Sequence, residues 1–281
     1  MARPLVVRTP VHTRAPTGRE RARRSATESW AIVPEAFRAG ALLPSPWDAL
    51  FGPLRAGRID ELVLVGQVGQ SLDGRIATTT GHSHYINGPD GLDHLHRLRA
   101  LVDAVVVGIG TALADDPRLT VRRVAGPQPA RVVIDPRGRL PMTARLLAAD
   151  GTARLVVTRP ETCLGLPSGV ERIPVAAEDG DMAPAAILAA LAARGFRRVM
   201  IEGGPQTFSR FLAAGCFDRV HIVVAPLILG AGPPAFELAP IARVDQGLRP
   251  PVHVHRLGDE VLFDCDLSAQ RRPIGRAKKS M

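Results

Sequence analysis

The chain has 281 residues, a formal net charge of +9, and 46% apolar and 22% charged residues. This composition is that of an ordinary globular protein and excludes a globally disordered or collagen-like chain. The three cysteines, Cys163, Cys216 and Cys265, form no C-x-x-C pair, which excludes a disulfide-dense scaffold and a cysteine-based zinc site. The apolar stretches are far shorter than about 18 residues, so we expect no membrane-spanning helix.

Most of the positive charge lies at the two ends of the chain. Residues 1–30 and 268–281 together hold twelve basic and two acidic residues, whereas residues 31–267 hold 24 basic and 25 acidic residues. Because no aromatic residues are interleaved with the basic ones, we interpret 1–28 and 268–281 as solvated basic tails and expect no nucleic-acid partner. Prolines at positions 4, 10 and 16 interrupt the amphipathic helix of a transit peptide, so we expect a cytoplasmic protein.

The rest of the chain divides into a short extension and one domain. Residues 29–60 carry Trp30, Phe37, Trp47 and Phe51 among prolines, which predicts that this segment packs against the main body. From residue 61 to 267, short β-branched runs alternate with helical stretches. In chain order the pattern predicts a strand at 62–68, a helix at 89–101, strands at 104–107, 131–134 and 154–157, a helix at 184–194, a strand at 198–201, a helix at 207–214, and strands at 219–224, 252–256 and 260–266.

This alternation predicts an α/β fold with a sheet covered by helices on both faces. Continuous apolar strands separated by helices are typical of parallel pairing. The last two predicted strands are joined by Leu257-Gly258-Asp259, which indicates a hairpin. We therefore expect a mixed, mostly parallel sheet with an antiparallel edge.

A glycine-rich turn is the strongest chemical signal in the sequence. The predicted strand at 198–201 runs into Glu202-Gly203-Gly204-Pro205, and a helix follows. Glycines let main-chain N–H groups approach a ligand, and the first turn of a helix leaves such groups unpaired, so the segment suits a diphosphate. It is equally consistent with an ordinary strand-to-helix turn. It is not the G-x-G-x-x-G fingerprint, so a standard dinucleotide-binding domain is not predicted.

Other polar segments are ambiguous by themselves. Asp73-Gly74 follows the first predicted strand and indicates either a turn or a carboxylate that lines a cleft. His94 and His96 are two residues apart on a predicted helix and point to different sides of it, so we expect no metal site there.

Together, however, these segments resemble the reductase domain of the bifunctional riboflavin-biosynthesis deaminase/reductase over about residues 61–267. The resemblance rests on the order and spacing of several motifs: Ser71-Leu72-Asp73-Gly74-Arg75-Ile76-Ala77, Gly81-His82-Ser83-His84-Tyr85-Ile86, Leu98-Arg99-Ala100, Gly108-x-Gly110-Thr111-x-x-x-Asp115-Asp116-Pro117-x-Leu119-Thr120-Val121-Arg122, Ile201-Glu202-Gly203-Gly204-Pro205 and Ala225-Pro226-x-x-Leu229-Gly230.

The resemblance implies a dihydrofolate-reductase-like three-layer fold, a homodimer and NADPH as cofactor. It implies reduction of the ribosyl side chain of 5-amino-6-(5-phosphoribosylamino)uracil, a phosphorylated pyrimidine, to the ribityl form. The residues carried over to the cofactor are Gly69, Tyr85, Thr111, Asp115, Pro136, Gly203, Gly204, Pro205, Gln206 and Thr207. Those carried over to the substrate are Ser83, Arg99, Leu119, Arg122 and Glu202. The arginines suit a phosphate, because a guanidinium can bind two of its oxygens.

Some roles stay open at this point. Asp73, Glu202 and water are the candidates for the proton donor, and Arg137 or Arg159, each just past a predicted strand, could meet a 2′-phosphate. Tyr85 stands where the family often has Trp. The deaminase signature, H-x-E with P-C-x-x-C, is absent from the sequence, so we expect reduction without deamination. The alternatives are an NADPH-dependent reductase of another pteridine-like or small carbonyl or imine substrate, and a nucleic-acid-binding protein with a vestigial reductase body.

Overall fold

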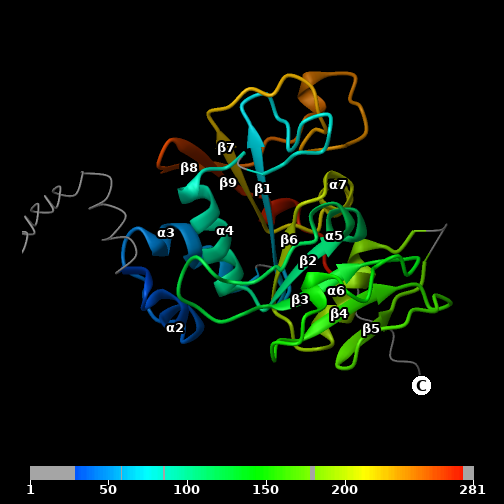
Figure 1. Cartoon of the computed structure of the whole chain (residues 1–281). Coiled ribbons are helices and arrows are strands. Elements are labelled where there is room, and N and C mark those ends of the chain that lie inside the picture. Colours follow the sequence, from blue (N-terminus) through cyan, green and yellow to red (C-terminus); the bar gives the residue numbers. More distant parts are fainter. Residues whose placement is uncertain (1–28, 58, 85, 178–180, 275–281) are drawn as a thin grey trace, which may run out of the picture.

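The computed structural model describes residues 29–57, 59–84, 86–177 and 181–274. The predicted N-terminal tail, 1–28, lies outside these residues, as does Tyr85. The fold is built on a nine-stranded sheet in the order β5-β4-β3-β2-β6-β1-β7-β9-β8 (Figure 1). Its strands are β1 Val63–Ser71, β2 Ala104–Gly108, β3 Ala130–Ile134, β4 Arg154–Thr158, β5 Val170–Pro174, β6 Arg198–Glu202, β7 Arg219–Ala225, β8 Val252–Leu257 and β9 Glu260–Asp266.

The sheet is mixed and mostly parallel, as predicted. Each neighbouring pair from β5 to β7 is parallel, whereas β9 is antiparallel to both β7 and β8. The antiparallel edge arises because two residues, Gly258 and Asp259, turn β8 directly into β9. The parallel strands need crossover connections, and most of these contain a helix.

Helices cover both faces of the sheet and complete an α/β architecture (Figure 1). Side chains of α4 (Pro89–Leu101) and of the short helices α2 (Val33–Arg38) and α3 (Trp47–Phe51) share one apolar cluster with β1 and β2. Side chains of α6 (Pro184–Ala192) and α7 (Pro205–Ala213) belong to a second cluster on the opposite face. Helix α5 (Ile109–Asp115) directly follows β2.

The N-terminal segment packs through its aromatic side chains. Trp30, Phe37, Trp47 and Phe51 are all buried in the cluster that contains α4. Trp30 lies edge-on to Trp47, with ring centroids 5.4 Å apart, and Trp47 stacks on Phe51 at 5.9 Å. The apolar surface of these rings, removed from water, is what attaches this segment to the domain.

The structure differs from the sequence-based expectation at three places. Helix α5 and strand β5 both occupy stretches for which the sequence pattern predicted no helix or strand. The third difference is in the basic C-terminal segment, where Arg271 is buried and bonded to Asp218, with Asp60 3.4 Å away. That arginine is not solvated, because two carboxylates of the domain compensate its charge.

Candidate active site

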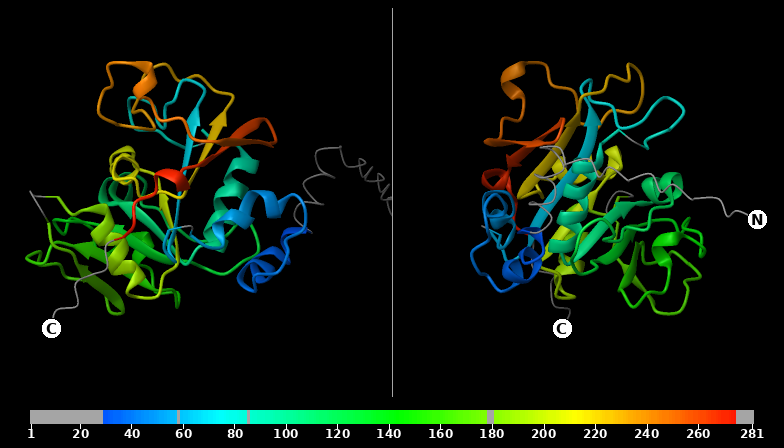
Figure 2. Two further views of the ribbon diagram at one scale, coloured as in Figure 1. Left: turned by 180° about the vertical axis from the view of Figure 1, so that it is seen from behind. Right: turned by 60° about the vertical axis from the view of Figure 1, so that its left-hand side comes forward.

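The parallel strands end at one edge of the sheet, and the predicted site residues follow these ends. In sheet order, β3 ends at Ile134, β2 at Gly108, β6 at Glu202, β1 at Ser71 and β7 at Ala225. The loops after β1 and β7 project together beyond this edge (Figure 2), where Leu72 N–H donates to Leu227 O at 2.8 Å. Ligands of open parallel sheets bind outside the carboxyl ends of the strands.

Two turns interlock at this edge. Thr111, in α5 after β2, lies against Gly204, where a Cβ would approach its Oγ1 to 2.6 Å. Thr207, in the first turn of α7, lies in the same way against Gly108. Gly203 and Gly204 both have positive φ, at 69° and 72°, a conformation that favours glycine. The β2–α5 and β6–α7 turns can therefore approach each other only because glycine stands at these positions.

The interlocked turns place helix N–H groups at the sheet edge. Helix α7 begins with Pro205, which has no N–H, so the amides of Gln206 and Thr207 are the first ones of the helix. The positive end of the helix dipole lies behind them. A main-chain cradle of this kind, without a Cβ over the glycines, suits the diphosphate of a dinucleotide.

Glu202 and Arg99 form an ion pair beside this cradle. Arg99 Nε donates to Glu202 Oε2 at 2.8 Å, and its Nη2 donates to Oε1. The remaining Nη1 donates to Thr120 O at 2.9 Å. The Arg99 side chain is only 5% exposed. Arg99 therefore links α4, the end of β6 and the loop before Val121, and it orients the Glu202 carboxylate.

Arg122 is exposed and lies close to the same pair. Its backbone N–H donates to Nδ1 of the buried His96 at 3.1 Å. Partial burial and the neighbouring charge of Arg99 lower the pKa of the Arg122 guanidinium. Burial, together with Arg99 and Arg122, lowers the pKa of His96 to about 3, so its imidazole is neutral and can accept this hydrogen bond.

The loop between α5 and Arg122 contains two residues in the left-handed region. Asp116 has φ 38° and Leu119 has φ 54°, conformations that cost free energy for any residue with a Cβ. The Leu119 side chain is 1% exposed and belongs to the α4 cluster, so only its main chain is available to a ligand.

Asp73 is held as an ionised carboxylate at the turn after β1. It accepts hydrogen bonds from Ser71 Oγ at 2.6 Å, Leu229 N at 3.1 Å and Gly230 N at 2.7 Å. These bonds, first that from Ser71 and then that from Leu229, lower the pKa of Asp73 to about 2. Asp73 therefore connects the loops after β1 and β7.

The other predicted residues also lie along this edge. Ser83 Oγ is 3.4 Å from Asp115 Oδ1, which joins a predicted substrate residue to a predicted cofactor residue. Gly69 is on β1, where a Cβ would overlap the amide of Asn87. Pro136 directly follows Asp135 after β3, and its carbonyl accepts a hydrogen bond from Thr162.

Some residues of this region were not found from the sequence. Gln67, His221 and Asp264 stand in register with Glu202 across β6, β1, β7 and β9, so the four side chains share one face of the sheet. On that face His94 Nε2 lies 3.0 Å from His221 Nδ1. Burial and His221 lower the pKa of His94 well below its usual value.

The row formed by Gln67, Glu202, His221 and Asp264 could not be predicted, because it depends on the order and register of the strands. A single polar residue within an apolar strand gives no such signal.

In the ranges described above, no group of three or more His, Cys, Asp or Glu side chains could hold a metal ion. Within the same ranges, every helix is too short or too polar to cross a membrane.

Comparisons with known proteins agree with this geometry. The model of the RibD C-terminal domain family matches residues 63–262. A 2,5-diamino-6-ribosylamino-4(3H)-pyrimidinone 5′-phosphate reductase of Methanothermobacter thermautotrophicus is 39% identical over 166 residues, which cover 57% of this chain and 76% of that protein. The riboflavin biosynthesis protein RibD of Aquifex aeolicus is 36% identical over 58% of this chain but only 46% of its own length.

The same family is found among solved structures. A diaminohydroxyphosphoribosylaminopyrimidine deaminase/5-amino-6-(5-phosphoribosylamino)uracil reductase of Thermotoga maritima superposes with a TM-score of 0.64 and 29% identity, over 73% of this chain and 56% of that one. This likeness confirms the fold predicted from the sequence motifs. With a family match that covers most of its length, this chain belongs to the RibD C-terminal domain family.

Proposed function

We propose that this protein is an NADPH-dependent reductase that converts the ribosyl side chain of 5-amino-6-(5-phosphoribosylamino)uracil to the ribityl form. The observation that carries the proposal is the interlocking of Thr111 with Gly204 and of Thr207 with Gly108, next to the Glu202–Arg99 pair. This arrangement supports a cofactor cradle and a substrate site side by side in a member of the RibD C-terminal domain family.

The glycine turns fit the diphosphate of the cofactor. A side chain at Gly204 would both strain the main chain and collide with Thr111, so the cradle is bare main chain by necessity. Gln206 and Thr207 amides would hold the diphosphate, and Thr111 would line its path. When bound, NADPH supplies a hydride for the C1′ carbon of the open-chain imine form of the ribosylamino group.

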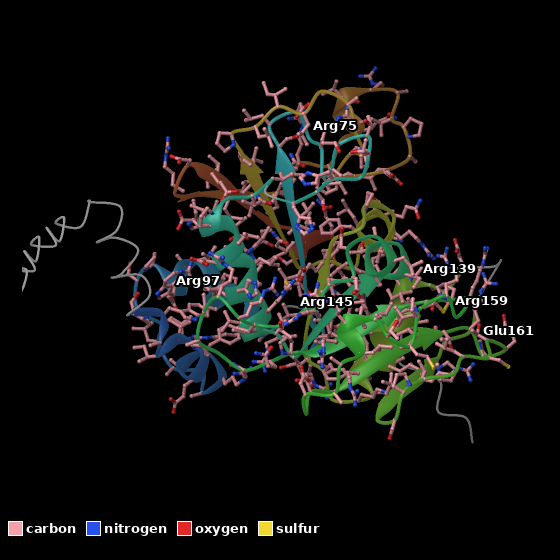
Figure 3. All side chains as sticks on the ribbon, viewed as in Figure 1. Arg75, Arg97, Arg139, Arg145, Arg159 and Glu161 are labelled. Atoms are coloured by element: carbon pink, nitrogen blue, oxygen red, sulfur yellow. The ribbon has the colours of Figure 1, made fainter. Side chains whose placement is uncertain are left out.

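The 2′-phosphate that distinguishes NADPH from NADH would meet Arg159. This arginine begins the loop after β4, and its backbone N–H lies 3.4 Å from Pro136 O in the loop after β3. Thr162 Oγ1 donates to the same carbonyl at 2.7 Å. Figure 3 places Arg159 on the side of the molecule formed by β4 and β5. These bonds hold the main chain of Arg159 beside the predicted cofactor residue Pro136.

Arg122 is the residue that would bind the substrate phosphate. It is exposed, whereas Arg99 is committed to Glu202 and Thr120. Arg99 would act on the substrate through Glu202, whose carboxylate it fixes in one orientation. Ser83 and the main chain of Leu119 would complete the group of residues that bind the substrate.

Proton delivery would come from water. Asp73 stays ionised at neutral pH because its pKa is about 2. Both oxygens of Glu202 accept hydrogen bonds from Arg99, which makes this carboxylate an oriented acceptor. The proton that the reduced side-chain nitrogen takes up therefore enters from solvent, and the chain's own groups fix the substrate.

A second copy of the chain would cover the β8–β9 edge. Ile222, Phe263 and Val254 stand in register across β7, β9 and β8, on the face opposite His221 and Asp264. Val254 is 60% and Phe263 36% exposed, an unusual position for a row of apolar strand residues. A homodimer that joins these rows would bury them.

A second substrate is favoured by the archaeal relative. That protein is named for reduction of the 2,5-diamino pyrimidinone, which still carries the amino group that deamination removes, and it is 39% identical to this chain over 166 residues. The two substrates differ only on the pyrimidine ring, and both present the same ribosyl phosphate.

A direct turnover assay tests the proposal. Purified protein is mixed with NADPH and either pyrimidine, each with and without its 5′-phosphate, and the absorbance of the reduced nicotinamide is followed. We expect loss of absorbance with the phosphorylated uracil and a much higher KM without the phosphate. Faster turnover of the diamino compound would move the assignment to the second substrate, and no turnover of either would refute the proposed function.

A further inference from the structure

The segment 29–54 lies outside the family match, which begins at residue 63, yet it contacts two elements that carry proposed substrate residues. One element is α4, which ends just after Arg99. The other element is the loop 121–128, which contains Arg122.

On α4 the segment contacts the side chain of Arg97. This guanidinium lies over the rings of both tryptophans, 4.7 Å from the centroid of Trp47 and 5.6 Å from that of Trp30. Figure 3 shows Arg97 at the junction between α4 and the N-terminal helices. Arg38 of α2 donates from Nη2 to Ala100 O at 3.3 Å, one residue beyond Arg99. A buried guanidinium on two aromatic faces is a directional contact as well as an apolar one.

The segment also contacts the tip of the loop 121–128. Trp30 Nε1 donates to Ala125 O at 2.7 Å. The next residue, Gly126, packs so closely that a Cβ there would come within 2.5 Å of Ala100 Cβ and 3.6 Å of Pro34. The tip therefore contacts both α2 and α4, although Ala125 and Gly126 themselves are exposed.

The rest of the loop is fixed by the domain itself. Gln128 closes its base, since its side chain bonds to both Val121 N and Val121 O at 2.7 Å. His96 of α4 accepts the N–H of Arg122 at 3.1 Å. Arg122 thus lies on a loop whose base is held by Gln128 and His96 and whose tip is held by Trp30.

From these contacts we infer that residues 29–54 act as an intramolecular brace that positions Arg122 relative to Arg99 and Glu202 and so tunes affinity for the substrate phosphate. The inference rests on the proposed function. It assigns Trp30 as a positioning residue, because it touches the loop and not the substrate. The cradle around Gly204 is not part of the brace, so cofactor binding is independent of it.

The test compares two substitutions in the same segment. Trp30→Phe keeps an aromatic ring over Arg97 but removes the N–H that donates to Ala125. Phe37→Leu is the matched control, because Phe37 is equally buried but faces Arg55 and Arg198, 5.8 and 5.6 Å from its ring centroid. Unfolding curves of both variants establish how much stability each loses.

The expected result is a selective loss of substrate affinity. For Trp30→Phe we expect KM for the phosphorylated pyrimidine to rise about threefold to tenfold, the range for one lost hydrogen bond, with kcat and KM for NADPH unchanged. KM for the substrate without its phosphate should not change, and Phe37→Leu should leave all four parameters as in the wild type. Equal effects of the two variants, or no change in KM, would overturn the inference.

Hydrogen–deuterium exchange separates this inference from the proposed function. Amides of residues 121–126 should exchange faster in Trp30→Phe than in the wild type and in Phe37→Leu. If the wild type does not reduce the pyrimidine, the proposed function fails, and unchanged exchange would then show that there is no brace either. Faster exchange with unchanged KM would show that the contact exists but does not position Arg122, which also overturns the inference.

Discussion

His96 shows how the arginines of the site determine the protonation of a neighbouring side chain. It is buried on α4, accepts a hydrogen bond from Arg122, and has a pKa of about 3, because burial and the nearby arginines oppose a positive charge. In the unfolded chain the same imidazole titrates near pH 6.5. Between these two values the unfolded state binds a proton that the folded state does not, so stability falls as the pH is lowered.

The prediction for His96 is a pH dependence of stability. Denaturant unfolding at pH 7 and pH 5 should show a lower free energy of unfolding at pH 5. In His96→Asn, whose side-chain oxygen can still accept from Arg122, this loss should be smaller by on the order of 1 kcal/mol. An equal loss in both proteins would contradict a neutral, buried His96.

Arg159 gives a prediction about cofactor choice. If it meets the 2′-phosphate, Arg159→Ser should raise KM for NADPH by about tenfold and leave KM for NADH unchanged, because only one cofactor carries the group. Steady-state kinetics with both cofactors measure this. Arg194→Ser, which removes an arginine paired with Glu171 on the surface, is the control and should change neither KM. A loss with both cofactors would place Arg159 in a structural role.

Among the helices, α4 is the one that carries Arg99, a residue of the proposed substrate site. Glu260 at the start of β9 caps its N-terminus, where it accepts from Gly88 N at 2.9 Å and Gly91 N at 2.8 Å. The carboxylate also interacts favourably with the helix dipole. The opposite end of α4 carries Arg99, so the cap helps to fix a residue far from it along the helix.

Glu260→Ala should therefore destabilise the fold by about 1 to 3 kcal/mol, since it leaves the buried N–H of Gly91 and the partly buried N–H of Gly88 without their acceptor. Denaturant unfolding measures the change. Glu61→Ala is a suitable comparison because its ion pair with Arg197 is largely exposed, and we expect it to cost less than about 0.5 kcal/mol. Similar losses in the two variants would contradict the capping role.

The sequence was informative where a local signal determines an element. Helix α4 was predicted with its observed bounds, because Gly88-Pro89 starts it and an apolar stripe continues to Leu101. Strand β5 was missed because only Ile173 among its residues is buried, so it lacks an apolar run. Helix α5 was missed because Gly110 interrupts its pattern and its seven residues are too few for a clear period.

In the candidate site, too, features with a local sequence signal could be predicted, and features that depend on long-range contacts could not. The turn after β6 was predictable as a turn, because two adjacent glycines followed by a proline between a predicted strand and a predicted helix are a local signal. The contact between Thr111 and Gly204 could not be predicted, because it depends on β2 and β6 being neighbours in the sheet. The hydrogen bonds from the N-terminus of α4 to Glu260 could not be predicted either, because nothing in the sequence of α4 or of β9 indicates that the two elements are in contact.

At the scale of the whole molecule, the exposed apolar row at the β8–β9 edge is the feature that a single copy does not explain. A single charge in this row should prevent association. We expect the wild type to sediment as a dimer and Val254→Glu as a monomer. Val244→Glu, also at an exposed valine but in the short 3-10 helix 244–246 between β7 and β8, should remain dimeric. A monomeric wild type, or a dimeric Val254→Glu, would refute the proposed interface.

If bare main chain at the interlocked glycine turns binds NADPH, a methyl group at Gly204 should weaken that binding, and titration calorimetry with Gly204→Ala measures the change. Gly195→Ala is the control, because Gly195 also has a positive φ, 87°, but a Cβ there would meet open space. We predict that the wild type and Gly195→Ala bind NADPH with similar affinity and that Gly204→Ala, in which the new methyl group collides with Thr111, binds at least about tenfold more weakly. Absence of NADPH binding to the wild type, or equal affinity in all three proteins, would contradict the account.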